Sequence, residues 1–162
     1  MGRRAFTVEE ANALVPQMES VLARIRELRS GVEESAERIQ LLDALWGVKL
    51  REPGTPDHEE FLRHRERVRS LVEETERLIR EEIGERGVRF PTGGLEHGLL
   101  DFPTTYRGRW VYLCWMSGEP EVRRWHEVDA GFQGRREVTE EQRRIMGRFD
   151  DPGELDDSLL DF

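Results

Sequence analysis

The chain has 162 residues, of which 36% are hydrophobic and 36% are charged, and its formal net charge is −9. This length suits one domain with a real core, and the high charged share points to long solvated helices. No stretch approaches about 18 consecutive apolar residues, and residues 1–6 lack the apolar segment of a signal peptide. We therefore expect no membrane span and a cytoplasmic location. The single cysteine, Cys114, excludes an intramolecular disulfide and predicts no cysteine-based zinc site.

The negative charge is concentrated at the C-terminal end. Residues 150–162 contain six acidic residues and no Lys or Arg, so the rest of the chain carries only −3. An acidic chain without a basic stripe argues against nucleic acid as a partner. The segment has no periodicity, which predicts a disordered acidic tail. The alternative is that it folds back on four arginines, Arg123, Arg124, Arg135 and Arg136.

Apolar residues recur in heptads through the first third of the chain, which is typical of a coiled-coil seam. Thr7 and Glu10 form a capping-box pattern at its start. We predict one long helix from residue 8 to about 49, with only Ser35 interrupting the seam. The seam residues are Ala11, Leu14, Met18, Val21, Ile25, Leu28, Val32, Ile39, Leu42 and Trp46.

A second helix follows a break in the chain. Pro53, Gly54 and Pro56 interrupt the pattern, Asp57 is a candidate cap, and apolar residues then recur at helical spacing up to about Ile83. This predicts an antiparallel, coiled-coil-like helical hairpin over about residues 8–84. The first helix is longer, so its residues 11–22 should pack on the region that follows.

The period changes to that of strands over about residues 88–149. Short aromatic and β-branched runs predict an antiparallel meander at residues 88–90, 99–102, 110–116 and 122–126, followed by a short helix within 140–149. Both faces of the 110–116 strand are apolar, which favours a second subunit as cover for one of them. The fold class is therefore α+β, with residues 1–149 as a single domain and residues 150–162 as the acidic tail.

Cys114 and His126 together suggest a thiol nucleophile with a histidine base. If residues 117–120 form the turn between two strands, His126 lies opposite Val111 and Cys114 points to the other face. The sequence therefore favours a buried structural thiol.

A histidine and carboxylate site is a second possibility. His126, Glu119 and Asp101 are candidate catalytic residues, and His126, Asp129 and Glu121 are candidate metal ligands, with His97 as a weaker one. The alternative is a hydrogen-bonded structural histidine. No cofactor follows from these residues.

A glycine-bracketed loop with arginines on both sides suggests an anion site, since guanidinium groups and glycine N–H groups bind carboxylate or phosphate. Its candidate ligand-binding residues are Arg135, Arg124, Gly131, Gly134 and Trp125. The alternative is that these arginines pair with neighbouring glutamates.

Several ordered motifs resemble a bacterial family of uncharacterised proteins, the domain of unknown function 2203 family. They are the opening Phe6-Thr7-Val8-Glu9-Glu10-Ala11-Asn12-Ala13-Leu14, then Gly98-Leu99-Leu100-Asp101-Phe102-Pro103, Leu113-Cys114-Trp115 with Gly118-Glu119, Trp125-His126 and Gly131-Phe132-Gln133-Gly134-Arg135. The similarity covers residues 6 to about 136 and implies no activity.

Two functions are compatible with these features. The sequence favours a homodimeric, non-enzymatic interaction module, because long charged helices offer surface rather than a cleft. Its partners would be a second copy, another protein or a small anionic ligand. The alternative is a small-anion-binding or metal-dependent enzyme with its site in the sheet and loop region around His126.

Overall fold

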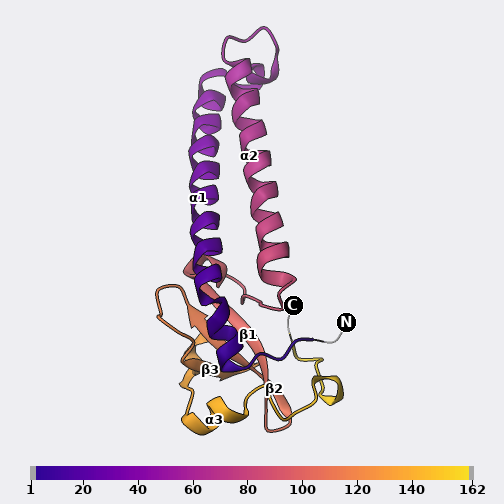
Figure 1. Cartoon of the computed structure of the whole chain (residues 1–162). Coiled ribbons are helices and arrows are strands. Elements are labelled where there is room, and N and C mark those ends of the chain that lie inside the picture. The colour runs from indigo at the N-terminus through magenta and orange to yellow at the C-terminus, as the bar shows by residue number, and fades with distance from the viewer. Residues whose placement is uncertain (1–2, 161–162) are drawn as a thin grey trace. The chain divides into compact units, whose positions relative to one another are not determined.

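The computed structural model describes residues 3–160 and shows an α+β fold. The chain divides into two compact units: a sheet unit, made of the residues up to Leu22 and from Glu81 onward, and a helical unit, Ala23–Arg80. The helices and strands are α1 (Val8–Trp46), α2 (His58–Leu78), β1 (Leu99–Tyr106), β2 (Arg109–Met116), β3 (Arg124–Glu127), β4 (Arg136–Glu137) and α3 (Glu140–Ile145), drawn in Figure 1.

The predicted long first helix is confirmed, and it begins at the predicted capping box. Glu10 N donates to Thr7 Oγ1 over 3.1 Å, and Thr7 N donates to Glu10 Oε2 over 3.3 Å. These two bonds satisfy backbone donors that the first turn leaves free. The preceding Phe6 N donates to Pro103 O over 2.8 Å, which ties the start of α1 to β1.

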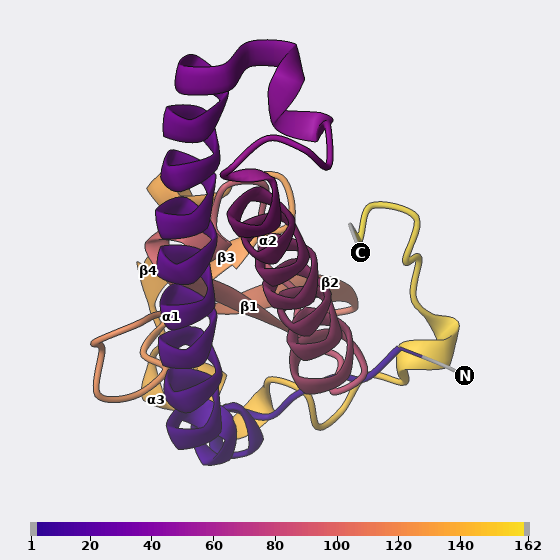
Figure 2. The ribbon, with the colours of Figure 1, turned by 90° about the horizontal axis from the view of Figure 1, so that it is seen from above.

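Within the helical unit, α1 and α2 lie side by side (Figures 1 and 2). Arg38 of α1 binds Glu60 of α2. A Cβ at Gly31 would lie 2.8 Å from Leu71 Cδ1, so glycine permits a close approach there. Ser35, the residue that interrupts the heptads, is fully buried, and its hydroxyl lies 3.0 Å from both His64 Nδ1 and Arg67 Nη1. Ser35 is thus a polar position inside the helix interface.

The connection between α1 and α2 is packed rather than open. α1 passes into a 3₁₀ helix, Gly47–Arg51, in which Leu50 packs with Leu42 and Phe61. Asp57 does not cap α2 with its side chain but accepts a 2.7 Å hydrogen bond from Trp46 Nε1.

The sheet is a four-stranded antiparallel meander in the order β1-β2-β3-β4. β1 and β2 are joined by Arg107 and Gly108, both with positive φ, as a tight two-residue hairpin turn requires. The predicted strand at residues 88–90 is reduced to one bridge between Arg89 and Asp101, and β4 was not predicted. The predicted short helix is confirmed as α3, which begins at a capping box of Thr139 and Gln142.

The predicted register between β2 and β3 is wrong by one residue. His126 lies opposite Tyr112, whereas the sequence placed it opposite Val111. The predicted pairing assumed a turn at residues 117–120, but the connection between the two strands is longer. Val122 N donates to Asn12 Oδ1 over 2.6 Å, and β3 begins at Arg124. Because side chains alternate between faces, this slip moves His126 to the other side of the sheet.

The chain itself covers both apolar faces of β2, so the sheet does not need the second subunit that the sequence predicted as cover. The face with Phe102 contacts Phe6, edge to face at 5.3 Å between ring centroids. On the opposite face, Trp110 and Tyr112 pack with Leu160 and Leu155 from the C-terminal segment.

The C-terminal segment up to Leu160 is placed against the sheet unit, in contrast to the predicted disordered tail. It contains a 3₁₀ turn, Pro152–Glu154, and Leu160 is only 7% exposed. Both views show it beside the N-terminal segment (Figures 1 and 2), where Arg3 Nη1 donates to Asp157 O over 2.9 Å. The predicted alternative, in which the segment folds back on Arg123, Arg124, Arg135 and Arg136, has the wrong contact residues. The segment packs on Trp110 and Tyr112 instead.

Candidate functional site

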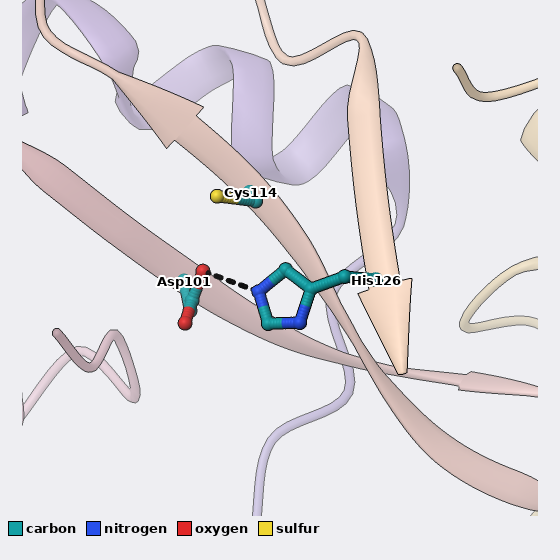
Figure 3. A group of neighbouring side chains, drawn as sticks. All are labelled: Asp101, Cys114 and His126. Carbon is teal, nitrogen blue, oxygen red and sulfur yellow. Dashed lines mark hydrogen bonds and ion pairs between the residues drawn. The ribbon is translucent and has the colours of Figure 1, made fainter. Parts of the chain in front are cut away.

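Three buried side chains that could ligate a metal meet within the sheet unit. Asp101 comes from β1, Cys114 from β2 and His126 from β3, and Figure 3 shows them on three neighbouring strands. Asp101 is paired with Cys114 across β1 and β2, while His126 is paired with Tyr112, two residues from Cys114. One ligand atom from each residue lies within 4.8 Å of the other two, and each residue is at most 2% exposed.

The imidazole of His126 is held at both nitrogens. Its Nε2 lies 3.2 Å from Asp101 Oδ1, and its Nδ1 lies 2.7 Å from the backbone oxygen of Glu127. The ring also lies beside Tyr112, with 5.6 Å between ring centroids. These contacts fix the orientation of the ring.

Arg89 completes the group. Its Nη2 and Nε donate to Asp101 Oδ2 over 2.8 and 3.3 Å, and its guanidinium lies 4.2 Å from the centroid of the Tyr112 ring. Two backbone hydrogen bonds with Asp101 hold Arg89 in place. We name Arg89, Asp101, Cys114 and His126 the sheet cluster.

Burial and charge oppose each other in this cluster. Burial alone would raise the pKa of Asp101, but hydrogen bonds and charges from His126 and Arg89 outweigh it and lower that pKa. Burial alone would lower the pKa of His126, but the hydrogen bond and charge of Asp101 outweigh it and raise that pKa. The geometry therefore favours an ionised pair inside the sheet unit.

Cys114 shares the face of His126, so the predicted separation of the two side chains onto opposite faces is wrong. The thiol is nevertheless not a suitable nucleophile. Burial, and then the negative charge of Asp101, raise the pKa of Cys114, whereas a nucleophilic cysteine needs a lowered one.

Of the predicted catalytic residues, the fold brings Asp101 and His126 together and leaves Glu119 outside. Glu119 lies in the β2–β3 connection, where both its carboxylate oxygens bind Arg135 Nη2. The predicted metal ligands Glu121 and Asp129 do not join His126 either, because Glu121 pairs with Arg123 and Asp129 lies on the rim of a separate cavity near Leu160. In the described part of the chain, only Asp101, Cys114 and His126 form a group that could hold a metal ion, so His97 is not part of one.

The candidate anion-binding residues do not converge on one site. Arg135 pairs with Glu119, and Arg124 lies 3.8 Å from Glu137. Trp125 is 3% exposed, packs edge to face on Tyr106, and is covered by Arg136. Gly131 precedes a short 3₁₀ turn, Phe132–Gly134, and Gly134 is the last residue of that turn. The alternative that the sequence offered, ion pairs with neighbouring glutamates, describes these arginines better.

Sequence reasoning missed Arg89 and Cys114 as members of the cluster. Arg89 stood in a predicted strand among many arginines, and nothing local distinguished it. Cys114 could have been found from strand parity alone if the register between β2 and β3 had been known.

Comparison with known proteins gives a family and no activity. Residues 4–138 match a family described as "Uncharacterized conserved protein (DUF2203)", a range that contains the whole sheet cluster and ends before α3. No curated protein and no solved structure matches the chain. No helix among the described residues combines the length and apolar character needed to span a membrane.

Proposed function

The chain belongs to the DUF2203 family of uncharacterized conserved proteins, and we propose from its structure that it is a non-enzymatic, homodimeric interaction module whose contact surface lies on the helical unit. One observation carries this proposal. Leu41, Leu45 and Val48 are 49%, 65% and 82% exposed, although Leu42 and Leu50 beside them are fully buried. We name these three exposed residues the apolar stripe.

The spacing of the apolar stripe fits a second copy of the chain. Leu41 and Leu45 are four residues apart, so they lie on one side of the end of α1. Val48 follows in the 3₁₀ helix that begins at Gly47. An antiparallel, two-fold contact centred on Leu45 sets Leu41 of one copy against Val48 of the other. Such a contact uses the same patch twice, which is how most homodimers form.

Charges at the two ends of the stripe are complementary in the same arrangement. Glu37 lies four residues before Leu41, and Arg51 lies three residues after Val48. The antiparallel contact brings each Glu37 towards Arg51 of the other copy. Opposite charges at the rim favour this orientation over a parallel one.

In this proposal the helical unit is a coiled-coil-like hairpin that presents the stripe at its turn. Buried heptad positions such as Ile25 and Leu28, and the ion pair between Arg38 and Glu60, support it. The net charge of −9 supports a protein that does not bind nucleic acid, and the unpaired buried thiol of Cys114 supports a reducing, cytoplasmic location.

The alternative function is a small-anion-binding or metal-dependent enzyme around His126. Its anion-binding part has less support, because Arg135 pairs with Glu119 and Arg124 lies near Glu137. Its metal-binding part concerns the sheet cluster and is independent of the apolar stripe.

Light scattering coupled to size exclusion tests the dimer. We expect twice the mass of one chain at micromolar concentration, and the mass of one chain for Leu45→Glu. Gln40→Glu is the matched control, because it adds the same charge at an exposed position away from the stripe. A monomeric wild-type protein would contradict the proposal. A Leu45→Glu variant that is still dimeric would show that the apolar stripe is not the dimer interface.

A further inference from the structure

The hydrogen bonds of His126 require a positive species between its ring and Asp101. The Glu127 carbonyl can only accept, so the Nδ1 nitrogen 2.7 Å from it must carry a hydrogen. In a neutral ring the other nitrogen, Nε2, then presents a lone pair. That lone pair faces the Asp101 carboxylate, so either a proton, as in the ion pair of the metal-free protein, or a metal ion must lie between the two acceptors.

The distances suit a metal ion as that species. The Nε2 to Oδ1 distance is 3.2 Å, which is longer than the roughly 2.7–2.9 Å of a charge-assisted hydrogen bond. Zinc binds nitrogen and oxygen at about 2.0–2.2 Å, so neighbouring ligand atoms of a tetrahedral site lie about 3.3–3.6 Å apart. The Cys114 sulfur belongs to the same group, within 4.8 Å of the other two atoms.

We propose that Asp101, Cys114 and His126 form a binding site for a thiophilic divalent transition metal of the zinc type, with one coordination position left for water or another ligand. One thiolate, one imidazole and one carboxylate suit zinc, cobalt or ferrous iron rather than magnesium or calcium. The single cysteine excludes a site of several thiolates, but a mixed set needs only one. The proposal does not depend on the dimer.

Outer contacts hold two of the three ligands, Asp101 and His126, as metal sites require. The Nε and Nη2 groups of Arg89 both donate to Asp101 Oδ2. Oδ1, which faces His126, is the oxygen that the metal would use. The Glu127 carbonyl fixes the tautomer that exposes Nε2 of His126. Such outer partners orient ligands and typically change metal affinity by about 10–100-fold when they are removed.

The charge of the sheet cluster is the same with and without the metal. With a thiol and an imidazolium, the charges of His126, Arg89 and Asp101 sum to +1. With a divalent metal, a thiolate and a neutral imidazole, the total is again +1. The metal thus takes the place of two protons, and its binding leaves no additional buried charge to be compensated.

Cobalt is the most informative probe. Protein purified with a chelator and a phosphine reductant is titrated with Co²⁺, and near-ultraviolet absorption from sulfur-to-cobalt charge transfer is recorded. We expect one equivalent per chain and displacement by Zn²⁺. Cys114→Ser should abolish the band, and Asp101→Asn and His126→Gln should weaken binding at least about tenfold.

His97→Gln is the matched control, since this exposed histidine belongs to the same unit but lies outside the sheet cluster. It should leave the titration unchanged. Circular dichroism shows which variants fold. If Cys114→Ser does not fold, His126→Gln provides the test instead. Zinc should raise the melting temperature of the wild type but not that of His126→Gln. Absence of the band in the wild type, or metal binding unaffected by Cys114→Ser and His126→Gln, would identify the cluster as a purely structural ion-pair network.

Discussion

A single guanidinium nitrogen of Arg135, Nη2, lies 2.7 and 2.8 Å from the two carboxylate oxygens of Glu119. The same nitrogen also reaches the backbone oxygen of Cys114 at 3.3 Å. The Arg135 side chain is only 10% exposed. Glu119 therefore compensates a nearly buried charge that also touches the backbone of the sheet cluster.

Glu119→Gln should lower the free energy of unfolding by about 2 kcal/mol, because it leaves the nearly buried charge of Arg135 without its counter-ion. The control is Glu121→Gln, whose partner Arg123 is 65% exposed, and it should change stability by less than about 1 kcal/mol. Urea denaturation followed by tryptophan fluorescence measures both. Equal effects of the two variants would contradict this account.

Gly147→Ala should destabilise the sheet unit by at least about 2 kcal/mol. Gly147 has φ of +74°, and a Cβ there would lie 2.4 Å from the backbone oxygen of Phe6. Gly108 has a similar φ of +75° but open space around it, so Gly108→Ala should cost only the backbone strain, about 1 kcal/mol. Comparing their denaturation midpoints separates the steric clash from the strain.

The packing of the C-terminal segment is tested by two adjacent leucines. Leu160 is 7% exposed and packs on Trp110 and Tyr112, whereas Leu159 is 74% exposed. Leu160→Ala should lower stability by about 2 kcal/mol, and Leu159→Ala should stay within about 0.5 kcal/mol of the wild type. If both variants melt at the wild-type temperature, the segment does not pack on the sheet in solution.

The ion pair of the sheet cluster predicts a pH dependence of the metal-free protein. Asp101 has a lowered pKa, so its stabilisation is present above its ordinary value of about 3.9 and is lost as pH falls through the folded pKa. His126 has a raised pKa, so its stabilisation is present below about pH 6.5 and is lost as pH rises through the folded pKa. The pair contributes fully between these two values.

Melting temperatures measured with a chelator from pH 4 to pH 9 check this. The wild type should lose stability on the alkaline side, and His126→Gln, which keeps a hydrogen-bond donor but cannot titrate, should lose less. Parallel profiles for the two proteins would contradict an ionised pair.

The helices could be predicted because their signals are local. The heptads and the capping box at Thr7 and Glu10 each lie within a few residues of the structure they specify. Ser35 was visible as an interruption, but its partners His64 and Arg67 come from the other helix, so its role was not.

The register of β3 and the composition of the site could not be predicted, because they depend on contacts between distant residues. The hydrogen bond from Val122 to Asn12, two residues before β3, joins residues 110 positions apart. His126 lies on the face of Cys114 because it pairs with Tyr112, and local sequence does not specify that pairing. Likewise, no local pattern indicates that Leu160, at the end of the acidic segment, lies on Trp110 and Tyr112.

The helical unit leaves the sheet unit after Leu22 and the chain returns at Glu81. Close to these two points, Gln17 Nε2 donates to Glu82 Oε2 over 2.8 Å, so the exit and the return of the chain are near each other. The helical unit is therefore an insertion into the sheet unit, between two points of the chain that lie close together in space. Every residue of the sheet cluster lies outside this insertion, so we expect a change in helix length by whole heptads to leave the cluster intact.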